Sequence, residues 1–108
     1  MKYCIMSNLS FDTPAKRSNL SQAIRDKIVA RMVWGKVTIV DSTDENNFPA
    51  SNVEIRFDNE TDMVEVFDFI KGRMEKIPVL KGFVSKHLCY HDEGYGHKRC
   101  DNWERFNK

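Results

Sequence analysis

Apolar and polar residues alternate along several stretches of the chain, with the period of two that is typical of β-strands. The clearest stretch is 52–58, in which Val53, Ile55 and Phe57 alternate with polar or charged residues. One face of such a strand is apolar, so we expect that face to be buried. Alternation or enrichment in β-branched residues predicts further strands at 2–9, 36–42 and 82–91.

Two other segments repeat their apolar residues with the 3.6-residue period of an α-helix. The stronger pattern follows Asn59, which can cap a helix, and places Glu60 and Asp62 in the first turn, where the helix dipole favours acidic side chains. Pro78 predicts the end of this helix. Its apolar stripe consists of Met63, Val66, Phe67, Ile70, Met74 and Ile77.

The other helix lies between the first two predicted strands, and its body is clearer than its beginning. Asp12 or Thr13 could cap it with Pro14 as the first helical residue, whereas Ser18 offers a later start. Gly35 predicts its end. Its apolar stripe consists of Leu20, Ala23, Ile24, Ile28 and Met32.

The predicted elements follow the order strand, helix, strand, strand, helix, strand. This order resembles the ferredoxin-like fold, an α+β sandwich (βαββαβ) in which a four-stranded antiparallel sheet carries two helices on one face. The resemblance covers residues 2–91 and implies the strand order 4-1-3-2. We assign residues 1–91 to one ferredoxin-like α/β domain and residues 92–108 to a C-terminal tail, whose aromatic residues predict that it packs on or near the open sheet face. This fold hosts many unrelated activities, so it predicts no function.

The implied strand order places the fourth strand beside the first and brings Cys4 close to Cys89. Alternation then predicts which side chains point away from the helices. That outer face would carry Cys4, His87, Cys89 and His91. The assignment has a cost, because it turns Lys86 toward the helices and leaves Phe83 outside.

The composition narrows the class of protein without identifying a function. The 108 residues include 17 basic and 16 acidic ones, and the net charge of +1 lacks the basic excess of most nucleic-acid-binding domains. No apolar run is long enough to span a bilayer, and the N-terminus lacks the hydrophobic region of a signal peptide. Three cysteines are an odd number, which does not indicate a secreted disulfide framework. We therefore expect a single soluble, cytoplasmic domain.

The side chains best suited to bind a metal gather in residues 86–100, which contain all three histidines and two of the three cysteines. Structural zinc prefers four thiolate and imidazole ligands arranged as a tetrahedron. We predict a zinc site formed by Cys89, His91, His97 and Cys100. The spacing of these residues differs from that of common zinc sites. The alternative is therefore open that they are ordinary polar residues and small buried hydrophobes.

We predict a small binding or regulatory protein without catalytic activity of its own, whose partner is a protein, either a second copy of the chain or another one. A metal-dependent hydrolase is the first alternative, although no H-E-x-x-H motif is present. It would use His87, His91, Asp92, Glu93 and His97. An RNA-binding module is the second alternative, although the outer face lacks an aromatic platform. It would use the basic residues on and around the first helix, which are Lys16, Arg17, Arg25, Lys27, Arg31 and Lys36.

Overall fold

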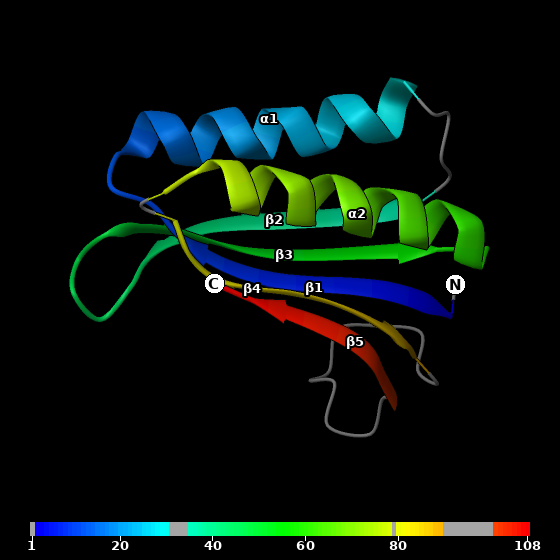
Figure 1. Cartoon of the computed structure of the whole chain (residues 1–108). Helices are drawn as coiled ribbons and strands as arrows, with labels where there is room; N and C mark the ends of the chain where they lie inside the picture. Colours follow the sequence, from blue (N-terminus) through cyan, green and yellow to red (C-terminus); the bar gives the residue numbers. More distant parts are fainter. Residues whose placement is uncertain (1, 31–34, 79, 90–100) are drawn as a thin grey trace.

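Two helices lie side by side on one face of a single antiparallel sheet (Figure 1). The computed structural model describes residues 2–30, 35–78, 80–89 and 101–108. The elements are β1 (Tyr3–Ser10), α1 (Pro14–Ala30), β2 (Gly35–Thr43), β3 (Pro49–Phe57), α2 (Glu60–Lys76), β4 (Lys81–Leu88) and β5 (Asp101–Asn107). Neither helix of this described part is long and apolar enough to cross a membrane.

The sheet has the strand order β2-β3-β1-β4-β5, and every neighbouring pair is antiparallel. Read from β4, the first four strands have the predicted order, which confirms the ferredoxin-like arrangement of residues 3–88. The predicted number of strands is wrong, because β5 adds a fifth strand at the edge beside β4. The end of the chain thus extends the sheet, where the sequence predicted a packed tail.

The strand β5 escaped prediction because its large apolar residues, Trp103 and Phe106, are separated by an odd number of positions, which breaks regular alternation. A register shift between Lys86 and His87 of β4 absorbs the irregularity. Phe106 then packs against the core, and the ring of Trp103 meets that of Tyr3 edge-on, with centroids 5.8 Å apart. Both aromatic residues thereby find apolar partners.

The turn between β2 and β3 spans only residues 44–48. The Asp44 carboxylate accepts hydrogen bonds from the backbone N–H groups of Asn46 (2.8 Å) and Phe48 (2.9 Å). The bond from Phe48 is the largest cause that lowers the pKa of Asp44 below its usual value. Asn47 takes the left-handed conformation that completes the turn, with φ of 64°.

The start of α1 is the earlier of the two predicted ones. The Thr13 hydroxyl oxygen accepts a hydrogen bond from the backbone N–H of Lys16 at 3.2 Å, and Pro14 is the first helical residue. Ser18 therefore lies inside the helix. The predicted end at Gly35 falls next to residues 31–34, outside the described residues, and Gly35 itself begins β2.

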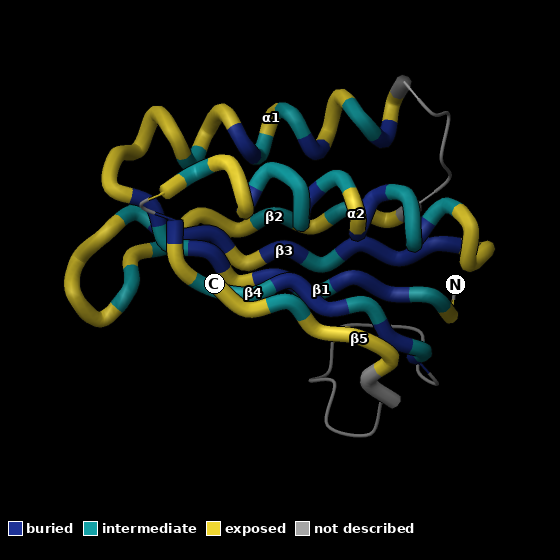
Figure 2. Tube along the Cα trace, in the orientation of Figure 1, coloured by how far each residue is buried: buried dark blue, intermediate teal, exposed yellow. Residues whose placement is uncertain are grey.

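The hydrophobic core fills the space between the helices and the sheet (Figure 2). Every predicted residue of the α2 stripe is buried except Ile77, which is partly buried. From α1 the core receives Leu20, Ile24 and Ile28. From the sheet it receives Ile5, Leu9, Val53, Ile55, Phe57 and Val84.

Lys86 faces the helices, as alternation predicted, and this position is compatible with its charge. Its ammonium nitrogen lies 5.1 Å from the ring centroid of Phe67 and 3.2 Å from the Glu104 carboxylate on β5. The aliphatic stem covers apolar surface while the ammonium group reaches an acidic partner at the sheet edge.

The cap of α2 can be tested by a single substitution. The Asn59 side-chain oxygen accepts a hydrogen bond from the backbone N–H of Asp62 at 2.9 Å. We expect Asn59→Ala to lower the free energy of unfolding by about 1 kcal/mol, because one N–H of the first turn loses its acceptor. Urea denaturation measures this loss, and Asn59→Ser, which keeps an uncharged acceptor beside the Asp62 carboxylate, is the control that should retain most of the stability.

Candidate metal centre

Two neighbouring strands bring two thiols and an imidazole together at one end of the sheet. Cys4 on β1 lies directly opposite His87 on β4. Cys89 follows β4, and its backbone N–H donates a 2.6 Å hydrogen bond to the carbonyl oxygen of Lys2. The ligand atoms of Cys4, His87 and Cys89 all lie within 4.8 Å of one another. We call these three residues the Cys–His–Cys cluster.

The sequence identified part of this cluster. The predicted proximity of Cys4 and Cys89 is confirmed. Cys89 was one of the four predicted zinc ligands, whereas His91, His97 and Cys100 lie outside the described residues, so that ligand set stays a prediction. Cys4 and His87 were absent from the predicted zinc ligands, because that prediction rested on spacing in the sequence. The signal that identifies them is the register of β1 against β4.

The cluster lies on the sheet face away from the helices, as predicted, but it is buried. The exposed fractions are 0% for Cys4, 1% for His87 and 2% for Cys89. None of the three belongs to the hydrophobic core between helices and sheet. This face is therefore buried at the start of β1 and exposed toward its end, where Asn8 is open to solvent. The prediction that this sheet face is open is correct only for its part near Asn8.

The buried guanidinium of Arg56 lies on the other side of Cys4. Arg56 on β3 pairs with Cys4 in the sheet register, and its Nε donates to the Glu54 carboxylate at 2.8 Å. Burial acts against this charge, but the hydrogen bond and attraction from Glu54 raise the pKa of Arg56 overall. A permanent positive charge thus stands beside the cluster.

Burial holds the Cys4 thiol in its protonated form. It raises the pKa of Cys4 far above the usual range, and the neighbouring Cys89 and Glu54 raise it further, while Arg56 lowers it. A buried, protonated thiol is a poor nucleophile. A bound metal ion would replace the proton, since a coordinating thiol is deprotonated outright. The cluster is therefore better suited to hold a metal than to attack a substrate.

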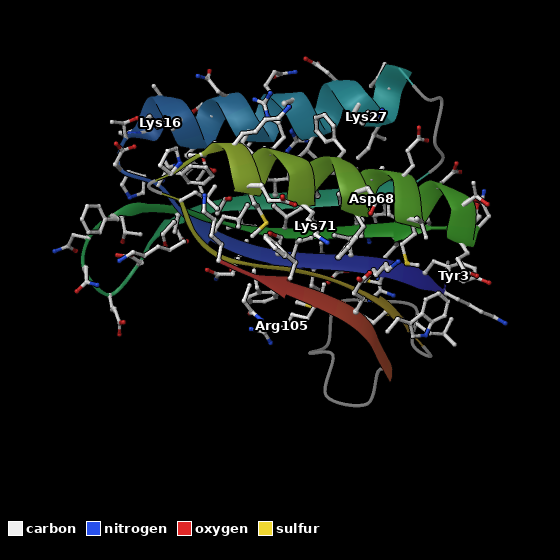
Figure 3. All side chains as sticks on the ribbon, viewed as in Figure 1. Tyr3, Lys16, Lys27, Asp68, Lys71 and Arg105 are labelled. Atoms are coloured by element: carbon white, nitrogen blue, oxygen red, sulfur yellow. The ribbon has the colours of Figure 1, made fainter. Side chains whose placement is uncertain are left out.

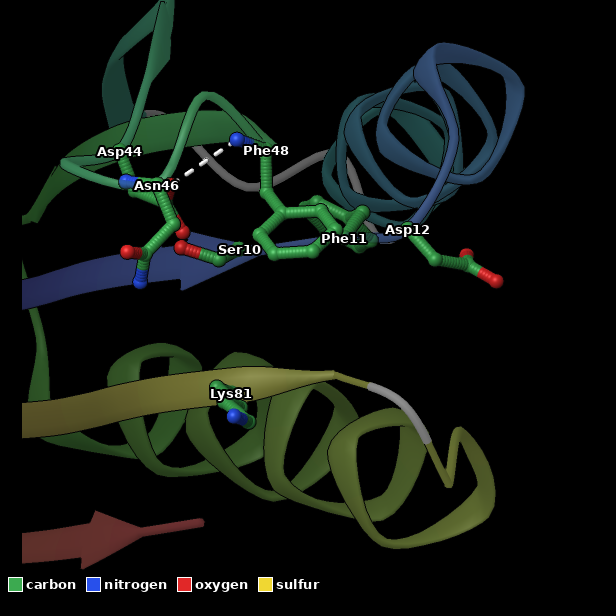
Figure 4. Close-up of a pocket in the computed structure, with 7 residues that line it drawn as sticks. All are labelled: Ser10, Phe11, Asp12, Asp44, Asn46, Phe48 and Lys81. Atoms are coloured by element: carbon green, nitrogen blue, oxygen red, sulfur yellow. Dashed lines mark hydrogen bonds between the residues drawn. The ribbon is translucent and has the colours of Figure 1, made fainter.

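A small cavity at the other end of the sheet is the second candidate (Figure 4). It has a volume of about 200 Å³ and is lined by Ser10, Phe11, Asp12, Asp44, Asn46, Phe48 and Lys81. Pockets for drug-sized ligands usually enclose at least about 300 Å³. Two lone pairs of the Asp44 carboxylate are already used by the hairpin backbone. This cavity is thus a by-product of the turn and carries no argument for a ligand.

Three of the six basic residues of the RNA-binding alternative, Lys16, Arg17 and Lys27, lie beside acidic ones. Lys16, labelled in Figure 3, lies 2.9 Å from the Asp12 carboxylate, and Lys27 lies 3.8 Å from that of Glu65. Arg17 donates to the carbonyl oxygen of Ser42. Local pairing reduces the positive field that would attract phosphates.

Comparison with known proteins identifies the fold of the chain. No known family model and no curated protein matches the sequence. The crystal structure of a dimeric ferredoxin-like protein from an uncultured marine organism is similar, with a TM-score of 0.59 and 9% identity, over 85% of this chain and 98% of that one. The NMR structure of a de novo designed protein with a ferredoxin fold has a TM-score of 0.50 and 13% identity, over 89% and 91%. At these identities the likeness shows the ferredoxin-like fold alone.

Proposed function

We propose that this ferredoxin-like chain is a small binding protein, without catalytic activity of its own, that holds a structural zinc ion. The observation that carries the proposal is the Cys–His–Cys cluster, whose ligand atoms lie within 4.8 Å of one another. The ion would join β1 to the end of β4. It would stabilise this end of the sheet on the face opposite the hydrophobic core between helices and sheet.

The chemistry of the donors favours zinc. Calcium and magnesium take oxygen ligands, whereas thiolates and imidazoles in a tetrahedron are the usual ligands of structural zinc. Zinc–ligand bonds of about 2.0–2.3 Å place tetrahedral ligand atoms about 3.5–3.8 Å apart. A contraction of at most about 1.0–1.3 Å from the present upper limit of 4.8 Å would therefore assemble the site around an ion.

A structural zinc site needs a fourth ligand. His91, His97 and Cys100 follow Cys89 closely in the sequence, and we propose that one of them completes the site. The proposed ligand set thus keeps Cys89 from the sequence prediction and adds Cys4 and His87. The other two predicted ligands would then have no metal to bind.

The burial of the cluster is the argument against a hydrolase. A catalytic zinc keeps an open coordination position that water and substrate can reach. His87, the described histidine of the hydrolase alternative, is 1% exposed and lies between two thiols. This surrounding favours a closed site over a reactive one.

We further propose that the partner of this protein is a second copy of the same chain. The observation that favours it is the similar marine protein, which is described as dimeric. The net charge of +1 adds little repulsion between two copies. Zinc binding and self-association are separate properties in this proposal, and each can fail without the other.

The zinc proposal is tested by the metal content of the untagged protein after extensive dialysis. We expect about one zinc ion per chain by mass spectrometry. Cys4→Ser and His87→Asn should each weaken zinc binding about tenfold or more. Even substitution of residues that only hydrogen-bond to metal ligands lowers metal affinity by that factor. Cobalt in place of zinc should give the visible absorption of a tetrahedral thiolate site in the parent and lose it in both variants.

The matched control for Cys4→Ser is Ile5→Val, which changes the adjacent residue on the opposite face of β1. It should bind zinc as the parent does. Single substitutions of His91, His97 and Cys100 identify the fourth ligand as the one whose loss releases zinc. A parent protein that contains no zinc and takes up neither zinc nor cobalt would show the proposal to be wrong.

A further inference from the structure

The exposed part of the sheet face opposite the helices holds a shallow groove of about 420 Å³. Side chains from four neighbouring strands line it, and most of them are exposed or half-buried. The uncharged ones that are exposed or half-buried are Met6, Asn8, Thr38, Val40, Asn52 and Phe83. We call these six residues the groove surface.

The groove surface has the composition of an interface core. Nine described residues line the groove and one of them is charged, whereas 31% of the whole chain is charged. This charged residue among the described ones is Glu54, whose carboxylate accepts a hydrogen bond from Arg56. Val40 is a large hydrophobic residue with 53% of its surface exposed. The centre of a protein–protein interface typically has few charged residues and is enriched in apolar, methionine and aromatic residues.

An arginine stacked on an aromatic ring borders the groove surface. The Arg105 guanidinium carbon on β5 lies 4.0 Å from the ring centroid of Phe83 on β4. Figure 3 shows Arg105 on the side of the sheet away from the helices. Arginine and aromatic residues dominate binding energy in interfaces, and stacking holds this arginine in a defined position.

We infer that the groove surface is where two copies of the chain associate face to face, an inference that rests on the self-association proposed above. Arg105 at the border is the one basic residue that the groove surface offers among the described residues, too little to attract a phosphate backbone strongly, which argues for a protein occupant over a nucleic acid. The groove surface also matches itself without repulsion under twofold symmetry, in which the same patch serves both partners. A charged partner would leave the uncharged centre of the groove unmatched.

The size of the surface sets the expected strength of association. The groove surface spans four strands spaced about 4.8 Å apart and, with at most two outward-facing residues per strand, about four positions rising about 3.3 Å each, so it presents on the order of 250 Å². A standard interface buries about 800 Å² per partner, and weak ones less than about 600 Å². We therefore expect a reversible dimer that dissociates on dilution.

Sedimentation velocity of the full chain over a range of concentrations, in reducing buffer with and without chelator, tests the inference. We expect Val40→Lys and Thr38→Arg each to weaken dimerisation at least tenfold. The matched control is Val29→Lys on α1, where Val29 is 75% exposed and lies on the opposite side of the molecule. It should dimerise as the parent does. All variants should keep the parent's zinc content and melting temperature, since their side chains are exposed.

The outcomes separate the surface from the proposed function. If the parent and both groove variants dimerise with the same strength, the groove surface is not the interface, although the proposal of self-association stands. A parent that is monomeric at every concentration overturns both. A dimer that separates on chelation is held by metal and overturns the groove surface as well.

Discussion

Removal of zinc from the metal-loaded protein is expected to lower the midpoint of thermal unfolding by roughly 15 °C. A ligand present at a thousand times its dissociation constant stabilises the folded state by about 4 kcal/mol, and each kcal/mol shifts the midpoint of a domain of this size by about 4 °C. The protein should nevertheless stay folded at room temperature. The reason is that the hydrophobic core between helices and sheet contains none of the residues of the Cys–His–Cys cluster.

Differential scanning calorimetry before and after chelation measures this shift. The same scans of Cys4→Ser give the control, because a variant without the site should melt alike with and without chelator. Return of zinc to the chelated parent should restore the original midpoint. A parent whose midpoint does not respond to chelator contains no stabilising zinc.

Gly82→Ala is expected to destabilise the fold by about 3 kcal/mol or more. Gly82 pairs with Leu9 of β1 near the start of β4 and has a φ of 134°, a conformation that other residues adopt only under strain. A Cβ atom there would overlap the carbonyl oxygen of Asn8 and lie 3.0 Å from the Cα of Leu9. Backbone atoms of the central strand cannot yield as a flexible side chain would. Gly82 also exchanges backbone hydrogen bonds with Lys108, so the change should loosen β5 too.

Gly72→Ala in α2 is the matched control, because it adds the same methyl group where nothing lies within 4 Å. Alanine is the better helix former, so this variant should gain about 0.5–1 kcal/mol. Urea denaturation of both variants gives the two free energies directly. Equal effects of the two substitutions would contradict the steric argument at Gly82.

The candidate site was only partly predictable. The face on which each side chain lies follows from alternation along one strand, whereas the distances between side chains follow from the pairing of different strands. Alternation on β4 placed His87 and Cys89 on one face, and the ferredoxin-like strand order brought Cys4 to them. Which of these side chains come within ligand distance depends on register, and register is a property of paired strands. Sequence spacing pointed instead to Cys89 with His91, His97 and Cys100, a set that the described residues do not test.

The sequence by itself determined the order of the first six elements, the helix cap at Asn59 and the apolar faces of β3 and α2. These features depend on residues close in the chain, where period and capping act directly. Only the tertiary structure decided that β5 joins the sheet, that the Cys–His–Cys cluster is buried, and that the same face is exposed near Val40. Each of these depends on contacts between segments far apart in sequence, whose register and covering no local pattern specifies.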